Sequence, residues 1–289
     1  MPLTYRTLNS IIYSMRILTI SGPLHREYGG PPLAATGIAR ALSRMNHEVH
    51  MFICGQSGTD VLVNSNFYSK LSSDLVNFKV FNRRNQSVYG TFLKFSEIFE
   101  VWKKLLKTDL VIFHQVYKLH YLGIWPLLLI QRKPYVLMPH GTLTFYHRKQ
   151  HRIRKFVFAF PTFLLLRTAK GIFVASEKEL VELPYYLKSK GKIVGLGIDL
   201  PKFVKPKKNS QIFNILYMGR LTKKKRLDVA LKAFSTLIKE SNCNLKFIIC
   251  GSGAEVDEKD LIELVDFLDI AEYVDFRGWV DTVEKDRKS

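Results

Sequence analysis

The sequence predicts an α/β protein with two domains, each built around a parallel β-sheet. The chain has 289 residues, and domains of ~150 residues would give about two of them. Short apolar runs typical of buried strands alternate with longer runs typical of helices, which favours parallel sheets covered by helices. Residues 201–210 are rich in proline and lysine and are typical of a linker. We therefore predict an N-terminal domain over residues 15–200 and a second domain over residues 211–289.

The N-terminal domain is predicted to open with a strand, a glycine-containing loop, a helix and a second strand. The first strand covers residues 15–20, and Pro31 with Pro32 begins the helix, where proline is tolerated. Further strands are predicted at residues 48–53, 78–81, 110–114, 135–139 and 171–175, with helices between them, one of them at residues 92–106. Residues 1–14 are predicted to be a leader, or to reflect a start assigned at Met1 instead of Met15.

The alternation restarts after the linker and predicts a second, smaller α/β unit. Strands are expected at residues 212–218, 245–250 and 273–276, and helices at residues 227–239 and 258–268. Glycines follow each of these strands, so the carboxyl ends of the strands are expected to run into tight turns.

The composition excludes several classes of protein. Hydrophobic residues make up 47% and charged residues 24% of the chain, which argues against disorder. The three cysteines, Cys54, Cys243 and Cys250, form no CxxC pair and suit neither a disulfide framework nor a zinc site, so a reduced cytosolic setting is expected. The longest apolar stretches, residues 121–130 and 156–166, fall short of the ~20 residues of a spanning helix. We also find no secretory signal peptide.

Charge is the unusual feature of the composition. Lysine and arginine number 44 against 25 aspartates and glutamates, which gives a net charge of +19. Residues 1–200 carry +16 of it and residues 201–289 carry +3. A basic first domain indicates an anionic partner, which would be a nucleic acid, an acidic membrane surface or a phosphorylated substrate.

Two loops of the first domain are candidate binding elements. Gly29 and Gly30 follow the first strand and precede a helix, where glycine lets the backbone approach a phosphate closely and the helix N-terminus adds partial positive charge. A plain tight turn is the alternative, and the GxGxxG spacing of dinucleotide enzymes is absent. His140 and Gly141 follow a later strand, and an imidazole there could donate to a substrate hydroxyl. The alternative is an ordinary loop histidine, because in a chain with eight histidines one near a strand end is unsurprising.

The second domain carries a basic turn between its first strand and helix. The run from Tyr217 to Asp228 includes Gly219, Arg220 and Lys225, and it places a guanidinium and ammonium groups where a phosphate could bind. Such cations stabilise the negative charge that grows on a departing phosphate. A solvated basic turn and a nucleic-acid contact are the alternatives. The turns at residues 251–253 and 278–281 are weaker signals.

Taken together, these loops form the pattern of a known family. They lie in stretches that read MRIL, YGGPPLAATGIARALSRMNHEVHMF, YVLMPHGTL, GIFVASEKEL, GLGIDL, LYMGRLTKKKRLDVALKAF and FIICGSGAEVDEKDLIELVDFLDIAEYVDFRGWV. In their order and spacing, over about residues 15–281, the chain resembles the retaining, nucleotide-sugar-dependent enzymes of glycosyltransferase family 4. The resemblance implies a GT-B-like fold of two Rossmann-type domains, an N-terminal one on the acceptor side and a second, incomplete one that binds the nucleotide sugar.

The resemblance implies a role for each matching residue. Gly29 and Gly30 would approach the donor diphosphate from the first domain, and cations of the second domain would neutralise it. The implied catalytic residues are His140, near the reacting carbon, and Arg220 and Lys225, which clamp the diphosphate. The implied donor-binding residues are Gly29, Gly30, Gly141, Gly219, Val280 and Asp281, the last two near the nucleobase.

The resemblance also implies a reaction. A sugar passes from a nucleoside diphosphate to a saccharide or lipid-linked acceptor, of the cell-surface polysaccharide or lipopolysaccharide type, with retention. The leaving phosphate helps to deprotonate the acceptor on the same face, so neither a metal nor another cofactor is expected. Localisation is expected to be cytoplasmic, with peripheral attachment to the inner face of the cell membrane as an addition.

The chain departs from the family pattern at three places. Family members continue past the last strand to a pair of glutamates that hold donor hydroxyls, whereas here Asp281 is followed only by residues 282–289. Leu196 replaces a customary asparagine, and Arg226 stands where glycine is common. We therefore expect a C-terminally truncated chain, and a non-catalytic member or half of a split enzyme with residual nucleotide binding is the alternative function.

A basic and apolar stretch raises the question of membrane contact. Residues 147–155 contain five lysines or arginines and no acid, and residues 156–166 are apolar apart from Thr162. This pattern suits docking on anionic lipid, with an ordinary core helix as the alternative. Specific nucleic-acid binding is not expected, because the sequence shows neither a recognition helix nor an aromatic platform.

Overall fold

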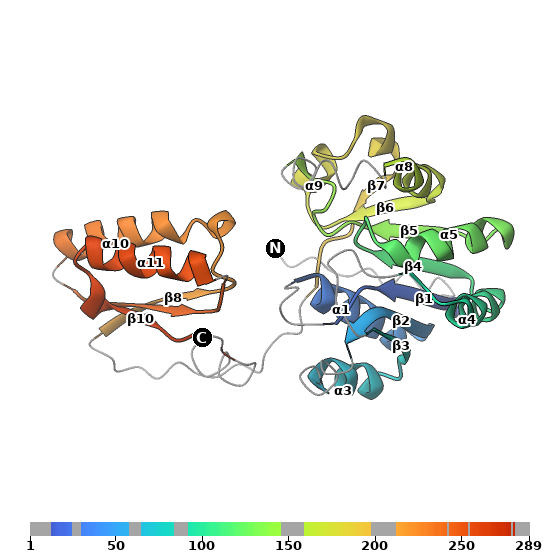
Figure 1. Cartoon of the computed structure of the whole chain (residues 1–289), viewed down its shortest axis with the longest axis horizontal. Coiled ribbons are helices and arrows are strands. Elements are labelled where there is room, and N and C mark those ends of the chain that lie inside the picture. The colour runs from blue at the N-terminus through green and yellow to red at the C-terminus, as the bar shows by residue number, and fades with distance from the viewer. Residues whose placement is uncertain are drawn as a thin grey trace, which may run out of the picture. The chain divides into compact units, whose positions relative to one another are not determined.

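The computed structural model in Figure 1 divides into two compact units, Met1–Asp199 and Leu200–Ser289. It describes residues 13–24, 30–57, 65–83, 92–145, 159–197, 212–241, 243–253, 255–278 and 280. Several predictions lie outside these residues: most of the leader, the linker at 201–210 with both domain boundaries beside it, the basic stretch 147–155, Gly29 and Asp281.

A parallel sheet of seven strands forms the centre of the first unit. Its order is β3-β2-β1-β4-β5-β6-β7. The strands are β1 (Arg16–Ser21), β2 (Glu48–Ser57), β3 (Asn77–Arg83), β4 (Leu110–His114), β5 (Tyr135–Met138), β6 (Gly171–Val174) and β7 (Gly191–Ile193). The strand order reverses between β1 and β4, which pair in parallel with Ile17 beside Leu110. In open α/β sheets this switch point is where ligands bind.

Helices cover both faces of this sheet. They are α1 (Gly30–Arg44), α3 (Ser65–Ser73), α4 (Phe95–Leu106), α5 (Leu119–Ile130), α8 (Ala159–Thr168) and α9 (Glu177–Val181), with a 3-10 helix at Tyr185–Lys190. Alternate residues of β1 point to opposite faces: Leu18 and Ile20 join a buried cluster with residues of α4, α5 and α8, whereas Ile17 joins one on the opposite face. This alternation between two covered faces explains why the strands read as continuous apolar runs.

The second unit is a smaller parallel sheet with helices on one face. Its strands are β8 (Ile212–Met218), β9 (Asn244–Cys250) and β10 (Val274–Phe276), in the order β10-β9-β8. The helices α10 (Leu227–Glu240) and α11 (Glu255–Phe267) lie on the same side of it (Figure 1). Leu245, Phe247 and Ile249 of β9 are buried against them. Short 3-10 helices cover Lys223–Lys225 and Ala271–Tyr273.

The predicted fold class is therefore confirmed, with two parallel sheets of unequal size. The strands predicted at residues 110–114 and 212–218 have the observed bounds. The short strand β7 was not predicted, because its three residues are not an apolar run and Lys192 and Ile193 are exposed. In the described part of the chain, no helix is both long enough and apolar enough to cross a membrane.

Candidate functional site

In the first unit, polar groups gather where β1, β4 and β5 end. These strands are neighbours in the sheet, so their carboxyl ends open on one edge. Gly22 follows β1, His114 is the last residue of β4, and His140 lies two residues beyond the end of β5. The backbone N–H of Gln115 donates to the carbonyl of Met138 at 2.8 Å, which holds the two turns together. Sequence reasoning identified His140 here but missed His114.

His140 lies in a tight turn at this edge, where it is partly buried. Its backbone is left-handed with φ of 49°, and Gly141 follows with φ of 78°. The amide of Thr142 donates to the carbonyl of Pro139 at 3.2 Å, and its hydroxyl donates to the same oxygen at 2.7 Å. A left-handed backbone costs a residue other than glycine roughly 1 kcal/mol or more. The turn therefore uses local strain to place this imidazole, a feature common at functional sites.

His114 and His140 form a hydrogen-bonded, stacked pair. His114 Nδ1 lies 3.0 Å from His140 Nε2, and the rings are 5.3 Å apart with an interplanar angle of 10°. His114 is buried, and within the described residues its Nε2 has no hydrogen-bond partner. We assign the shared proton to His114 Nδ1, because this leaves no buried N–H without an acceptor. His140 then accepts at Nε2 and carries its own proton on Nδ1.

Both imidazoles are neutral near pH 7. Burial lowers the pKa of His140 from 6.5 to about 4. Burial also lowers the pKa of His114 well below its usual value, and the neighbouring His140 lowers it further. A neutral His140 can donate one hydrogen bond to a ligand hydroxyl without adding a positive charge to the site.

A buried lysine lies at the same edge. A Cβ placed on Gly22 would be 3.5 Å from Lys118 Nζ and 3.7 Å from the Gln115 side-chain oxygen, so these groups surround the end of β1. Burial lowers the pKa of Lys118 to about 8. Sequence reasoning missed Lys118, although its position four residues after the end of β4 was an available signal.

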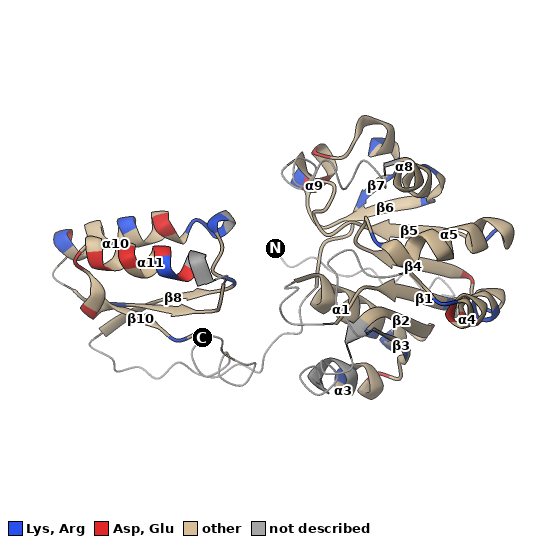
Figure 2. Ribbon diagram, viewed as in Figure 1, with Lys and Arg blue, Asp and Glu red and all other residues tan. Residues whose placement is uncertain are grey.

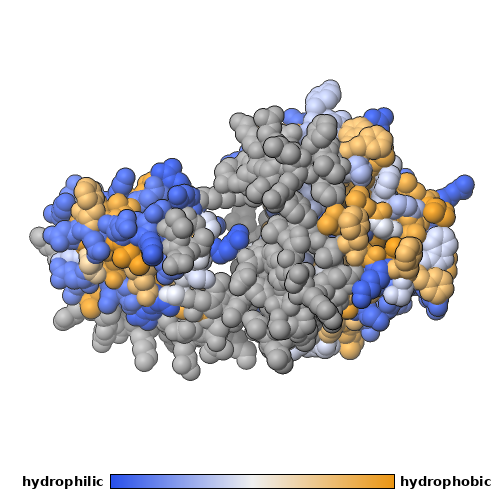
Figure 3. All heavy atoms as spheres, in the orientation of Figure 1, coloured by the Kyte–Doolittle hydropathy of each residue, from blue (hydrophilic) through white to orange (hydrophobic). Residues whose placement is uncertain are grey.

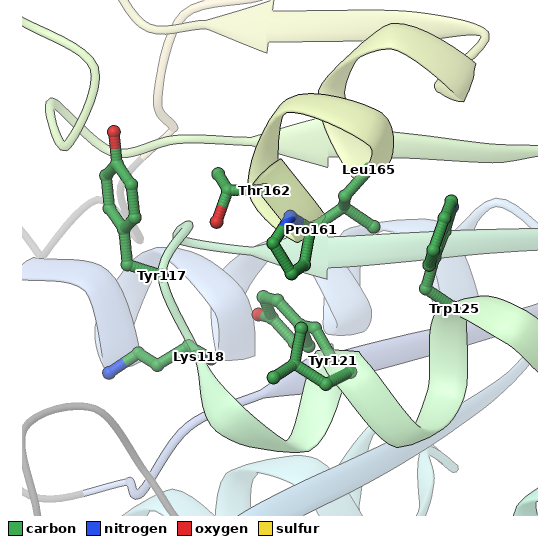
Figure 4. A pocket seen from close by; sticks show the side chains of 8 residues that line it. Tyr117, Lys118, Tyr121, Trp125, Pro161, Thr162 and Leu165 are labelled. Carbon is green, nitrogen blue, oxygen red and sulfur yellow. The ribbon is translucent and has the colours of Figure 1, made fainter. Parts of the chain in front are cut away.

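Lys118 also lies at a small pocket between α5 and α8. Figure 4 shows its mostly apolar lining, which includes Tyr121, Trp125 and Leu165, and the Lys118 ammonium directed away from Trp125 and Leu165. The lining residues are Tyr117, Lys118, Tyr121, Leu122, Trp125, Pro161, Thr162 and Leu165. The ammonium of Lys118 therefore lies at the carboxyl ends of β1, β4 and β5, here called the strand-end edge, and not in this apolar pocket.

Gly30 begins helix α1, as the glycine-loop interpretation requires. No acidic residue lies in the first turn of α1, so no carboxylate within that turn offsets the partial positive charge of the helix N-terminus. A Cβ built on Gly30 would meet no described atom within 4 Å. Its partner in the prediction, Gly29, lies outside the described residues.

In the second unit, glycine turns after β8, β9 and β10 meet at one edge. A Cβ on Gly251 would lie 1.8 Å from the carbonyl oxygen of Gly219, so only glycine fits there. The Gly251 amide donates to the Gly278 carbonyl at 2.7 Å, which joins the third turn. Val280, two residues further on, is buried, and Asp281 lies outside the described residues. The glycine turn at residues 251–253 was a weak signal in the sequence. In the structure it lets the backbone pack closely against the Gly219 turn.

The basic turn after β8 leaves both predicted cations at the surface. Arg220 and Lys225 are exposed, and the Tyr217 hydroxyl donates to the Arg220 carbonyl at 2.9 Å, which fixes the turn. Arg226 adopts a left-handed backbone with φ of 52°. Glycine adopts this conformation without strain, which explains why glycine is common at this position in the family pattern. The guanidinium of Arg226 pairs with Asp228 at 3.0 Å and so points along α10.

The structure thus brings the predicted residues together within each unit. His140 and Gly141 share the strand-end edge of the first unit, and Gly219, Arg220 and Lys225 share that of the second. The roles of all these residues in donor binding and catalysis stay predictions. His114, Gln115 and Lys118 are additions to the predicted set.

Two successive parallel-sheet units, each with its candidate groups at the carboxyl ends of strands, are the building blocks of the GT-B glycosyltransferase fold. A family model described as Glycosyltransferase Family 4 matches residues 28–202, and one described as Glycosyl transferases group 1 matches residues 201–287. The first covers more than half of the chain. The chain therefore belongs to the Glycosyltransferase Family 4 that this model describes. Among curated proteins, no sequence matches it significantly.

Solved structures support the same fold. Anabaena HepE in complex with UDP and glucose aligns with a TM-score of 0.66 at 17% identity, covering 92% of this chain and 70% of that chain. Sucrose-phosphate synthase from Thermosynechococcus elongatus aligns with a TM-score of 0.62 at 14% identity, covering 94% and 72%. The lipopolysaccharide outer core galactosyltransferase WaaB aligns with a TM-score of 0.60 at 15% identity, covering 95% and 71%. At these identities the likeness establishes the fold alone.

Proposed function

We propose that this protein transfers a sugar, of the hexosyl type, from a nucleoside-diphosphate sugar to a saccharide or lipid-linked acceptor with retention of configuration. The observation that carries the proposal is the succession of the two family matches over units whose strand ends hold His140 in one case and Arg220 with Lys225 in the other. Because HepE is described in complex with UDP-glucose, UDP-sugars are the first donors to test.

Each unit contributes a distinct part of the proposed chemistry. The acceptor hydroxyl attacks the anomeric carbon on the face from which the diphosphate leaves, the bond from that carbon to the phosphate oxygen breaks, and the hydroxyl proton passes to the leaving phosphate. Arg220 and Lys225 stabilise the charge that develops on the diphosphate. The neutral His140 donates from Nδ1 to the donor sugar and orients it.

No metal or other cofactor is part of the proposal. In the proposal the negative charge of the diphosphate is neutralised by Arg220, by Lys225 and by the N-terminus of α1 at Gly30. Gly29, Gly141 and Gly219 let the backbone approach the donor closely. Val280 and Asp281 lie beside the nucleobase. We expect transfer to be unchanged when the purified chain is treated with a chelator. A loss of transfer that Mg²⁺ restores would contradict this part of the proposal.

The test is transfer by the purified chain, measured as release of UDP and as product formed from UDP-sugars and saccharide acceptors. The double variant R220A/K225A should lower the transfer rate at least ~100-fold, because two charge-assisted contacts to the developing charge are lost. Lys239→Ala, an exposed lysine in the last turn of α10, is the matched control and should keep full activity. Equal donor affinity in R220A/K225A and in the control would overturn the clamp assignment.

A non-catalytic role, as half of a split enzyme, is the second candidate. It is favoured by β8, which in the described part of the chain pairs with a strand on one side only, that of β9. This candidate predicts nucleotide binding without transfer until a second polypeptide is added. Transfer by the purified chain alone would exclude it.

The cytoplasmic setting and the lipid-linked acceptor are parts of the same proposal. They are supported by the basic first unit, with a net charge of +16 over residues 1–200, which attracts anionic lipid. Product analysis with soluble saccharides and with lipid-linked acceptors presented in vesicles distinguishes the two acceptor classes.

A further inference from the structure

Helix α4 has two apolar faces, and only one of them is covered. Val101 and Leu105 are buried against the first unit's core. Phe95, Phe99 and Leu106 are instead 91%, 58% and 58% exposed. At ~100° per residue these three side chains fall within about 40° of one another around the helix, on a single outward stripe. A helix on a soluble surface normally turns charged residues outward, so this stripe requires an explanation.

The end of α5 extends the stripe. The Gln131 side-chain amide donates to the carbonyl of Trp102 at 3.1 Å, and Lys133 Nζ lies 3.4 Å from the carbonyl oxygen of Leu106. These contacts place the last residue of α5, Ile130, which is 67% exposed, beside the C-terminal half of α4. Figure 3 shows hydrophobic side chains gathered on the face that α4 and α5 occupy in Figure 1.

Cations surround this apolar stripe. Lys94, Lys103, Lys107 and Arg132 are exposed, and Lys103 Nζ lies 4.3 Å from the centre of the Phe99 ring. Figure 2 shows the basic residues on α4. We define the α4–α5 surface as Phe95, Phe99, Leu106 and Ile130 with Lys94, Lys103, Lys107 and Arg132.

The two acidic residues of α4 have contacts of their own. Glu100 pairs with Lys79 at 2.9 Å. Glu97 accepts from the backbone amide of Lys94 at 2.8 Å and so serves the helix N-terminus. The α4–α5 surface therefore presents aromatic and aliphatic side chains inside a rim of positive charge.

We propose that the α4–α5 surface docks the protein onto an anionic lipid bilayer. Phenylalanine, leucine and isoleucine side chains would enter the boundary between headgroups and acyl chains, while the four cations stay at the level of the anionic headgroups. Each lysine or arginine near such a surface contributes about a five-fold factor to binding. The case for vesicle binding is made from this surface and does not depend on the proposed function; only the use of the surface to reach a lipid-linked acceptor rests on that function.

The test is cosedimentation of the full chain with vesicles of phosphatidylcholine alone or with ~30% phosphatidylglycerol, an anionic surface of the kind basic segments bind. We expect binding to the anionic vesicles, weaker at high salt, and little binding to phosphatidylcholine alone. The variant F95S/F99S and the charge variant K103E/K107E should each lower the partition coefficient at least ten-fold. The controls F267S, at an exposed position of α11, and K239E, on α10, should bind as the unchanged chain does.

Several outcomes would overturn the proposal. One is equal binding by the variants and the controls, and another is equal binding to both kinds of vesicle. A third is a dimer in solution that F95S/F99S dissociates, since the surface would then be an interface between two copies. If circular dichroism shows that F95S/F99S is unfolded, K103E/K107E still tests the proposal. Transfer to a soluble acceptor should be unchanged in both variants, so failure to bind vesicles and failure of the transferase function are distinguishable.

Discussion

At the residue scale, the pairing of His114 with His140 does more than either imidazole could alone. The bond of 3.0 Å between His114 Nδ1 and His140 Nε2 occupies one nitrogen of His140. The proton of His140 is thereby placed on Nδ1, and the ring orientation is fixed. In the proposed function His114 is thus a positioning residue, which acts on a substrate only through His140.

This pairing predicts different effects for two substitutions of His114. His114→Leu removes the donor and should lower the transfer rate about 10-fold with a smaller change in the donor KM, because orientation and not binding is lost. His114→Asn keeps an N–H near the position of Nδ1 and should retain most of the rate. Steady-state kinetics of both variants, with thermal unfolding as the control for folding, make the comparison. Equal rates in the two variants would contradict a positioning role.

The low pKa values of this pair predict acid sensitivity of the fold. The pKa of His140 is about 4 in the folded chain against 6.5 for the free side chain, and the pKa of His114 is lowered in the same direction. Between pH 6.5 and pH 4 the unfolded chain binds protons that the folded chain does not, so this stability is present above pH 6.5 and lost as pH falls through that window. For His140 the loss is up to about 3 kcal/mol.

Urea unfolding followed by tryptophan fluorescence measures this loss in a W279F background, where the remaining Trp102 and Trp125 both lie in the first unit. The urea concentration at the unfolding midpoint should decrease when the pH is lowered from 7 to 4.5. In the His140→Gln variant this decrease should be smaller, because the group that resists protonation is gone. Between pH 7 and pH 9 the histidine pair should contribute no change. The same decline in both proteins would show that other groups cause it.

At the element scale, strand β8 is one of the two edge strands of the second sheet, as far as the structure describes that sheet. It hydrogen-bonds to β9 with Phe213 beside Leu245, and in the described part of the chain its other edge has no strand partner. Phe213 is 64% exposed. An unpaired strand edge with exposed apolar side chains is a template for pairing with another chain.

Phe213→Lys should therefore reduce self-association of the purified protein. A lysine on an edge strand keeps its charge in water and opposes edge-to-edge pairing. The concentration at which light scattering shows oligomers should rise several-fold. Thr236→Lys adds the same charge on the exposed side of α10 and should leave this concentration nearly unchanged. A similar shift in both variants would point to net charge and not to the edge.

The sequence predicts elements well where apolar runs are buried and poorly where they are not. The strands at 110–114 and 212–218 and the helix at 227–239 are found almost as predicted. Strand β7 and helix α3 are not predicted, because their polar residues carry no clear period. For the site, His140 and the basic turn follow from motifs, whereas His114 reads as the end of an apolar strand. Its importance depends on β4 and β5 being neighbours, and one sequence does not contain that pairing.

At the scale of the whole molecule, charge differs between the two units. Residues 1–200 carry +16 and residues 201–289 carry +3, and α10 and α11 carry charges of both signs (Figure 2). A basic first unit attracts anionic partners over the range of the Debye length, about 8 Å at physiological salt. The second unit offers a few local cations, such as Arg220 and Lys225, which suits recognition of one small anion.

The proposed function predicts that a nucleotide sugar protects both units from hydrogen exchange. Saturating UDP-glucose, at ~100 times its Kd, would stabilise a binding-competent state by about 2.7 kcal/mol and slow exchange that requires opening. We expect slower exchange of backbone amides at residues 140–144, after β5, and at residues 219–221, after β8. Amides of α3 serve as the internal control, because α3 packs against β3, which β2, β1 and β4 separate from β5 in the sheet order. R220A/K225A should abolish protection at both places, since under the proposed function one donor contacts both units and is lost from both when one set of contacts is removed. Protection confined to residues 219–221 would instead mean that the second unit binds the nucleotide by itself and that the first unit's histidine pair has another substrate.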